Sequence, residues 1–319
     1  MKGYNNFFLG ENFQLDLPEY DYYKNDIALN NVTGKEELDY TYYSVIQSKS
    51  RRVPILSASN IFRIKFEKAL REGDFKEDDR VKENEQLASK DYSNFNSIKA
   101  KSIDKGHMTK REDVQWDLNG DVEAAVNAAI STFFYPNAAP QHGQMNKGPW
   151  KNLENSVIIK GRVPEPAKVS VFTGPVLDAE DPEYKSTLKD GSIFKIPILF
   201  WKIIYYTKED NLLYRAGFLM SQINLLRRDN LINEIAFREF GLVDRPTSLK
   251  PFLDFKEDEN YQVPVSMIEK LTNLQFTPAL DRHENVQPTI LKLEQVQIRD
   301  FDKSLEGNVS EYEVTGLMV

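Results

Sequence analysis

Three short segments between residues 104 and 154 carry residue types that together could cleave a phosphodiester bond. They read Asp104-Lys-Gly-His107, Asn137-Ala-Ala-Pro-Gln141 and Asn146-Lys-Gly-Pro-Trp-Lys-Asn-Leu-Glu154. Hydrolysis of a phosphodiester needs a base that deprotonates water, a cation that balances the developing charge, and donors that position the phosphate. Each requirement has a candidate residue in or near these segments.

His107 is the candidate base, because histidine is the side chain that titrates closest to neutral pH. The preceding Asp104-Lys105-Gly106 has the composition of a tight turn that would present the imidazole at the end of a strand. The Asn146 side chain offers a neutral oxygen ligand, which suits a hydrated hard cation such as Mg²⁺. Glu154 follows about 80° further around a helix, so it can face the same cavity and hold metal-bound water.

Basic residues gather around the same segments, although the chain carries a formal net charge of −8. Residues 97–111 have a net charge of +4, and residues 48–52 add three basic side chains and no acid. A local basic groove on an acidic protein can still bind a polyanion, because field focusing depends on local charge. The candidates for contacts to phosphate groups are Arg51, Arg52, Lys110 and Arg111.

Each of these residues also has a purely structural explanation. A histidine beside a glycine is often a turn or packing residue, Asn137 stands in a turn-like segment, and Asn146 could cap a helix. Glu154 could be a solvated helix residue, and residues 48–52 could form a polar hairpin tip. The shared order and spacing of the three segments favours a site over these separate explanations.

Composition limits the classes of protein that remain. The chain has 319 residues, 40% of them hydrophobic and 12% aromatic, which is enough for a large core in one sheet-rich domain. The absence of cysteine excludes disulfides and thiolate-bound metals. Residues 193–206 are the most apolar but are too short to span a bilayer, and the first residues have no signal-peptide-like run. We expect a soluble protein without membrane contact, in the cytoplasm or exported.

Histidine is rare in this chain, with only three residues. His142 directly follows Gln141 and is close enough in sequence to line the same site. His283 lies in a polar stretch and is expected to be exposed. A zinc site needs three or four nitrogen, sulfur or carboxylate ligands, and the sequence contains no such cluster.

The pattern of hydrophobic residues predicts strands and helices in one domain, residues 1–285, with an N-terminal extension over about residues 1–35. Alternation after residue 285 predicts one or two appended strands in a C-terminal extension, residues 286–319, whose role is unknown. The predicted strands are 40–46, 53–58, 157–159, 169–173, 200–206 and 215–221, and the predicted helices are 121–132, 146–155, 229–240 and 264–274.

The three segments resemble the hallmark motifs of the DNA/RNA non-specific endonuclease family: Asp-Arg-Gly-His, Asn-x-x-Pro-Gln and Asn-x-x-x-Trp-x-x-Leu-Glu. The similarity extends to flanking segments and spans roughly residues 3–275. It implies an α+β, ββα-metal (His-Me finger) fold, in which a central, mainly antiparallel sheet is flanked by helices. It also implies DNA and RNA substrates, and family members often dimerise.

The same resemblance implies roles for individual residues. His107 would be the general base, Asn146 the single direct protein ligand of a hydrated Mg²⁺ that Mn²⁺ could replace, and Glu154 an organiser of metal-bound water. Asn137 would shape the site and orient the histidine, and Lys105 would contact phosphate. The expected products carry 5′-phosphate ends. Whether a protein inhibitor or another regulatory partner restrains the enzyme is open.

Three positions depart from the family pattern. The family arginine is Lys105 here, which keeps the charge but loses the planar bidentate fork. The arginine that usually follows the glutamate by one turn is replaced by apolar residues at 158 and 159, and Pro136 removes a backbone donor beside Asn137. These departures bear on rate and substrate range more than on the fold.

The sequence thus predicts a metal-dependent endonuclease that hydrolyses DNA and RNA with little sequence preference. The first alternative is a catalytically weakened member of the same fold that binds nucleic acid without cutting it. A second is a hydrolase of small phosphodiesters or nucleotides in a narrower pocket, and a third is a protein in which all motif residues serve turns and caps. DNA or RNA preference and biological role, whether scavenging, defence or toxicity, are not decided by these residues.

Overall fold

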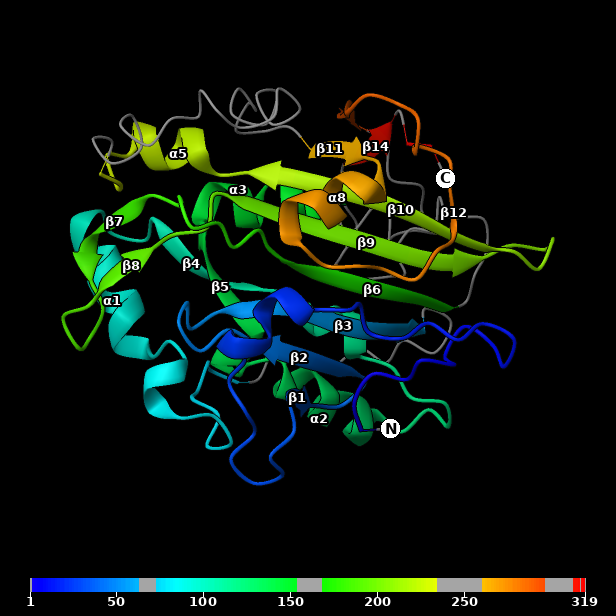
Figure 1. Ribbon diagram of the computed structural model, residues 1–319, viewed down its shortest axis with the longest axis horizontal. Coiled ribbons are helices and arrows are strands. Elements are labelled where there is room, and N and C mark those ends of the chain that lie inside the picture. The colour runs from blue at the N-terminus through cyan, green and yellow to red at the C-terminus, as the bar shows by residue number, and fades with distance from the viewer. Residues whose placement is uncertain are drawn as a thin grey trace.

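The computed structural model describes residues 2–62, 73–153, 168–233, 260–295, 312–315 and 317–318. Its main feature is a sheet with the strand order β1-β2-β3-β6-β9-β10-β11-β13-β14, antiparallel throughout, while β12 pairs in parallel with β10 (Figure 1). The strands of this sheet are β1 Glu37–Asp39, β2 Tyr43–Gln47, β3 Pro54–Phe62, β6 Lys168–Pro175, β9 Leu199–Thr207, β10 Leu213–Ser221, β11 Asn260–Val263, β12 Leu280–Asp281, β13 Thr289–Gln295 and β14 Tyr312–Thr315.

Two separate hairpins and short helices lie around this sheet. The hairpins pair β4 Ile103–His107 with β5 Ala138–His142, and β7 Glu183–Thr187 with β8 Ile193–Lys195. The α-helices are α1 Ser89–Ile98, α2 Val122–Ser131, α3 Gly143–Lys147, α4 Pro149–Leu153, α5 Ile223–Arg228 and α8 Val265–Thr272, and the 3₁₀ helices are η1 Asp21–Asp26, η3 Glu83–Glu85, η4 Arg111–Val114 and η5 Tyr135–Asn137. The predicted α+β class with a mainly antiparallel sheet is confirmed.

The sheet is covered on both faces, as the burial of the side chains of β9 shows. Its aromatic and branched side chains are buried at every position except the last, and successive side chains of a strand point to opposite faces. Phe200 and Ile204 belong to the core cluster that contains Trp150 of α4. Trp201 and Ile203 belong to a second cluster, which includes residues of the N-terminal segment and of α8. The sheet therefore separates two cores, and the large buried apolar residues of the motif segments belong to the first of them.

Several predicted elements are confirmed in place. The strands predicted at 40–46, 53–58, 169–173, 200–206 and 215–221 correspond to β2, β3, β6, β9 and β10, and the helices predicted at 121–132 and 264–274 correspond to α2 and α8. Asp121 caps α2 as expected, since its carboxylate accepts from the backbone N–H groups of Glu123 and Ala124. The alternating stretch after residue 285 supplies β13, which extends the main sheet through β11.

Other predictions need correction. The helix predicted over 146–155 is interrupted: α3 ends at Lys147 and α4 begins at Pro149, because Gly148 leaves the helical region with φ −100° and ψ −115°. In this conformation a Cβ on Gly148 would lie 2.6 Å from the carbonyl oxygen of Gln144. The helix predicted from residue 229 is wrong at its start, since α5 has ended and Asn230 is left-handed at φ 56°. His283 is buried and not exposed. The strand predicted at 157–159 and the end of the 229–240 helix lie outside the described residues.

Candidate active site

The three motif segments meet in one β4–β5–α3 unit. In the hairpin, Asp104 pairs with Gln141 and His107 pairs with Ala138, and α3 follows β5 without a linking residue. His107 is the last residue of β4, and Asn137 immediately precedes β5. This strand–strand–helix order is the ββα arrangement implied by the motifs, and it places Asn146 on the helix.

Asp104 fixes the orientation of the Asn146 amide. Asn146 Nδ2 donates a hydrogen bond of 3.1 Å to Asp104 Oδ2, and Lys147 Nζ lies 2.7 Å from the same oxygen. A carboxylate accepts and cannot donate, so the amide nitrogen must face Asp104 and the amide oxygen must point away. Within the described part of the chain, that oxygen accepts no hydrogen bond. A neutral oxygen held in this way fits a hydrated Mg²⁺ or Mn²⁺.

Gln141 has an unusual environment on the same side of the hairpin. Its side chain is fully buried, and in the described ranges neither amide atom has a hydrogen-bond partner. It lies across Gly106 so closely that a Cβ there would be 2.1 Å from Gln141 Oε1. Gly106 of the first motif is therefore required by Gln141 of the second. A buried amide without a partner costs about 1–3 kcal/mol, so it marks a place where water or a hydrated ion would be stabilised.

Aromatic rings surround His107 and Lys105. The His107 ring lies 4.6 Å from Phe75 and 5.0 Å from Phe133, measured between ring centroids, and the second contact is edge-on at 84°. Lys105 Nζ lies 5.6 Å, 5.8 Å and 5.6 Å from the ring centroids of Phe75, Tyr92 and Tyr135. The shared contact with Phe75 is consistent with strand alternation, which puts residues 105 and 107 on one face of β4.

Asp104 and Gly106 accordingly occupy the opposite face of the strand. The structure therefore groups Lys105 with His107 among aromatic rings, and Asp104 with Asn146 and Gln141 among polar groups. The two groups therefore lie on opposite faces of the same short strand, β4.

Asn137 is fully buried, and its amide is occupied by backbone groups. Oδ1 accepts from Thr109 N at 2.9 Å, while Nδ2 donates to Thr109 O at 2.8 Å and to Thr132 O at 3.0 Å. The Asn137 carbonyl also accepts from Met108 N at 2.8 Å. These bonds hold the two residues that follow His107. Pro136 is accommodated in η5, where it stands in the first turn and no helical N–H is needed.

Two of the four predicted phosphate-binding residues form ion pairs away from the hairpin. Arg51 Nη2 lies 2.6 Å from the buried Asp181 carboxylate, and burial raises the pKa of Asp181 to about 6. Arg52 Nη2 lies 2.6 Å from Asp190. Both arginines thus link the β2–β3 turn to the region of β7 and β8, and none of their contacts to described residues involves the β4–β5–α3 unit.

The other two predicted phosphate contacts, Lys110 and Arg111, lie three and four residues after His107 and are half-buried at the start of η4. Arg111 Nη2 lies 3.4 Å from Glu112. Glu154, the predicted organiser of metal-bound water, lies outside the described residues, which end at Leu153 of α4. Substrate contacts for all four basic residues stay predictions.

His142 anchors α3, a role that the sequence did not reveal. It is buried, its Nδ1 accepts from Gln144 N at 3.3 Å, and its Nε2 lies 3.0 Å from Asp229 Oδ2. Asp229 also pairs with Lys99 at 2.7 Å and with Arg228 at 3.1 Å. Burial lowers the pKa of His142 despite the nearby carboxylate, while its ion pairs hold the pKa of Asp229 well below its usual range. The residue adjacent to the second motif therefore caps the helix that carries Asn146.

The described ranges contain no group of three or more histidine, aspartate or glutamate residues that could hold a metal. Also within those ranges, no helix combines the length and apolar content that a membrane crossing requires.

A family model for DNA/RNA non-specific endonucleases matches residues 25–283. The chain belongs to the DNA/RNA non-specific endonuclease family. The match includes all three motifs and nearly the whole of the main sheet, so the β4–β5–α3 unit lies inside the family domain. The family assignment made from the motifs is confirmed.

Known relatives agree with this family assignment. The chain is 29% identical over 252 residues to the uncharacterised protein y4fB of Sinorhizobium fredii, covering 77% of this chain and 34% of y4fB. It is 26% identical over 213 residues to mitochondrial endonuclease G of Homo sapiens, covering 65% of this chain and 57% of that protein. The chain therefore spans about half or less of the length of these relatives.

A solved structure has the same fold. One chain of a crystal structure of an EndoG/EndoGI complex, which concerns the mechanism of EndoG inhibition, superposes with a TM-score of 0.50 at 21% identity. The superposition covers 76% of this chain and 85% of that chain. The ββα-metal nuclease fold predicted from the motifs is confirmed.

Proposed function

We propose that this chain is a metal-dependent endonuclease that hydrolyses DNA and RNA with little sequence preference. The observation that carries the proposal is the Asn146 amide, which Asp104 orients with its oxygen outward on the helix of a β4–β5–α3 unit whose first strand ends at His107. Family membership supports the reaction class, and the local geometry supports the assignment of residues.

Asn146 and Gln141 would hold the hydrated Mg²⁺ on the polar face of β4, with Mn²⁺ as a substitute. When bound, the ion supplies positive charge that stabilises the pentacovalent phosphate and the leaving 3′ oxygen. Asn146 would contact the ion directly through Oδ1, and the orphaned amide of Gln141 would hydrogen-bond to its water shell. Glu154 keeps its predicted role as an organiser of that water.

His107 would take the proton from the attacking water at a ring nitrogen. The water oxygen then forms a bond to phosphorus while the bond between phosphorus and the 3′ oxygen breaks. The departing 3′ oxygen takes up a proton from solvent, which leaves a 5′-phosphate and a 3′-hydroxyl. The scissile phosphate would bind at the end of β4, because this is the place from which residues of both strand faces can be reached. Asn137 would contribute by holding Met108 and Thr109, so that the backbone after the base cannot shift.

Lys105, Lys110 and Arg111 are the basic residues that we assign to the nucleic acid backbone. In the described structure Lys105 has no carboxylate partner, and the aromatic rings around it attract its ammonium without neutralising the charge. Arg51 and Arg52 are weaker candidates for this role than the sequence suggested, because Asp181 and Asp190 already occupy their guanidinium groups.

Substitution of the base and of the metal ligand tests the proposal. In Mg²⁺, His107→Ala should slow cleavage of plasmid DNA and of a single-stranded RNA by about 10²- to 10⁴-fold, with a nearly unchanged melting temperature. Asn146→Ala should also weaken the binding of Mn²⁺, measured by calorimetry without substrate. Gln144→Ala is the control for this measurement, since Gln144 is exposed on the same helix. Cleavage by His107→Ala at the wild-type rate would remove His107 from the mechanism.

A second candidate function is binding of nucleic acid without cleavage, and Lys105 is the observation that favours it. Lysine lacks the bidentate fork of the family arginine, so phosphate could be bound with too little geometric control for turnover. A gel shift that weakens with salt, with no products in Mg²⁺ or Mn²⁺, would establish this function in place of the first.

Partners of the proposed enzyme are a separate question. A homodimer is typical of the family, and the EndoG/EndoGI complex is a precedent for inhibition by a protein. We propose both for this chain, and light scattering of the purified protein, alone and mixed with candidate inhibitors, would test them.

A further inference from the structure

Phe75 contacts both the proposed base and the proposed phosphate-binding lysine. Its ring lies 4.6 Å from the His107 ring, and Lys105 Nζ lies 5.6 Å from its centroid. The ring also packs against Phe133 at 5.3 Å and Tyr135 at 5.8 Å. Phe75 is half-buried, so its outer side faces solvent while its inner side covers the aromatic face of β4.

The segment that carries Phe75 is firmly attached to the chain that leads into the second motif. Lys76 N donates to Phe133 O at 2.9 Å, and Tyr135 N donates to Lys76 O at 3.0 Å. Two residues before Phe75, Gly73 has a φ of +110°, and a Cβ on it would lie 3.2 Å from the Phe133 ring. Phe75 therefore cannot move away from His107 without breaking these backbone contacts.

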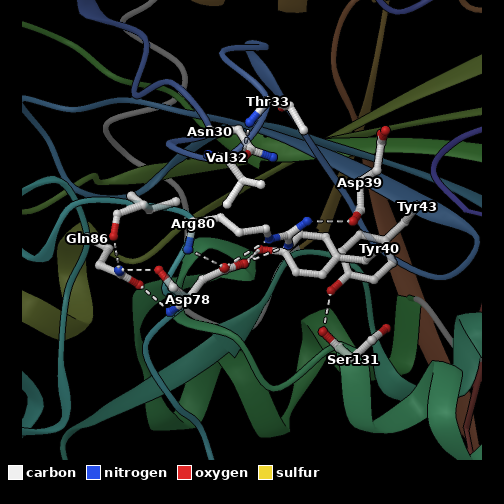
Figure 2. A network of polar contacts seen from close by, with 11 residues as sticks. Asn30, Val32, Thr33, Asp39, Tyr40, Tyr43, Asp78, Arg80, Gln86 and Ser131 are labelled. Atoms are coloured by element: carbon white, nitrogen blue, oxygen red, sulfur yellow. Dashed lines mark hydrogen bonds and ion pairs between the residues drawn. The ribbon is translucent and has the colours of Figure 1, made fainter.

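A buried polar network fixes the other end of this segment (Figure 2). The Asp78 carboxylate accepts from Tyr40 Oη at 2.6 Å and from Arg80 Nη2 at 2.7 Å, while Arg80 Nη1 donates to the backbone oxygen of Asp39 at 2.9 Å. Gln86 hydrogen-bonds to both backbone groups of Asp78, at 2.9 Å each. The segment is thus held to Asp39 of β1 and to Tyr40, which follows β1, so the chain just after Phe75 is restrained.

We propose that Phe75 is a positioning residue of the active site, which holds the His107 imidazole and the Lys105 ammonium side by side on one face of β4. This inference rests on the proposed nuclease function, because a positioning role for Phe75 requires that His107 and Lys105 act on nucleic acid. A carboxylate placed between the two groups would neutralise the lysine. A neutral aromatic ring restrains the imidazole by packing and attracts the ammonium through its face, leaving both available to substrate.

The replacement of the family arginine makes such a restraint useful. Lysine has a flexible four-carbon side chain and no planar fork, and the ring torsion of histidine is broad in the absence of packing. In this chain the cluster of Phe75, Tyr92 and Tyr135 confines the ammonium, and Phe75 with Phe133 confines the imidazole. Phe75 contacts both groups.

Phe75→Leu is the direct test, with Phe62→Leu as a matched control. Phe62 is also half-buried and packed between aromatic residues, and Lys168 Nζ lies 5.5 Å from its ring, but it belongs to the second core. We expect Phe75→Leu to lower kcat by about 10- to 100-fold with a smaller effect on KM. Phe75→Tyr should restore most of the rate, and Phe62→Leu should leave it nearly unchanged. Equal kcat values for Phe75→Leu and Phe62→Leu would overturn the proposal.

A spectroscopic measurement separates this proposal from the nuclease assignment. The chain has three histidines, so the His107 ring protons can be assigned in a proton NMR spectrum as those missing from His107→Ala. Their resonances should be displaced by the ring currents of Phe75 and Phe133, and should move toward the position of a free histidine in Phe75→Leu but not in Phe62→Leu. If the wild type cuts no nucleic acid, the proposed function fails while this measurement still decides whether Phe75 restrains His107. Unmoved resonances in a folded Phe75→Leu, or in Phe75→Met if the leucine variant does not fold, would exclude the restraint.

Discussion

On the two faces of β4, the side chains of the candidate site are held in position by different kinds of interaction. On one face, Asp104 directs the Asn146 amide through a hydrogen bond, and Lys147 pairs with the same carboxylate. On the other face, Lys105 and His107 are confined by aromatic rings, and the described residues include no carboxylate partner for Lys105. A metal ligand needs a defined oxygen direction, which hydrogen bonds supply. A base and a phosphate-binding cation need to keep their ability to take a proton or to attract an anion, which packing does not impair.

Asp104→Asn should have the largest effect, because it breaks the directional interaction of the polar face. An asparagine at position 104 can donate as well as accept, so it no longer forces the Asn146 oxygen outward. Loss of such an outer contact typically costs about 10- to 100-fold in metal affinity or activity. Mn²⁺ affinity measured by calorimetry and the cleavage rate in Mg²⁺ should fall together, whereas Asp210→Asn in the exposed β9–β10 turn should change neither. Unchanged Mn²⁺ affinity in Asp104→Asn would show that the carboxylate does not orient the ligand.

Gly106→Ala should have the next largest effect, and this effect should be a loss of stability against unfolding. The new methyl group would meet Gln141 Oε1 at 2.1 Å, and overpacking of this kind typically costs about 1–3 kcal/mol in the free energy of unfolding. Gly143→Ala is the matched control from the same unit, since its Cβ would make only an ordinary 3.4 Å contact. Urea denaturation measures both variants.

The double variant Gly106→Ala/Gln141→Ala sharpens this prediction. Removal of the Gln141 side chain should restore much of the lost stability, because the clash disappears together with a buried amide that has no partner. Cleavage should stay low if the Gln141 amide serves the water shell of the metal. Recovery of both stability and activity would limit Gln141 to a packing role.

Acid should destabilise the folded protein through His142 and Asp229. Burial lowers the pKa of His142 in the folded protein, so the unfolded chain binds more protons and stability falls as pH decreases from about 6.5 through the folded pKa. The lowered pKa of Asp229 acts in the same direction, but only below about pH 4. Between pH 7.5 and 5, His142→Gln should therefore lose less stability than the wild type in urea denaturation. A variant with the wild-type slope would show that His142 does not titrate on unfolding.

The sequence predicted which segments come together, but it did not predict the contacts that hold them. The order of the motifs placed His107, Asn137 and Asn146 correctly on one ββα unit, since each is separated by only a few residues from the strand or helix that carries it. The continuous helix predicted over 146–155 was wrong, because Gly148 adopts a non-helical φ of −100° and ψ of −115°, which a glycine permits but does not require. The buried position of His283 also depends on surrounding structure.

The basic residues show more clearly that contacts between distant segments could not be predicted from the sequence. In the sequence, Arg51 and Arg52 resemble Lys110 and Arg111 as candidates for phosphate contacts. In the structure, the first two pair with carboxylates about 130 residues away along the chain. No local sequence pattern predicts these ion pairs, because they form only where the β7–β8 region packs against the β2–β3 turn.

The sequence by itself determined the family and the α+β class, because these follow from motifs of residue types at short fixed spacings. The base and the metal ligand proposed from the same motifs stay predictions. Only the tertiary structure decided that Asp104 orients Asn146, that His142 anchors α3 through Asp229, and that Phe75 covers His107 and Lys105. These contacts join segments that lie 30 or more positions apart along the chain. Folding brings such segments together by burying apolar surface, and this burial is non-directional, so the sequence does not reveal which distant residues will meet.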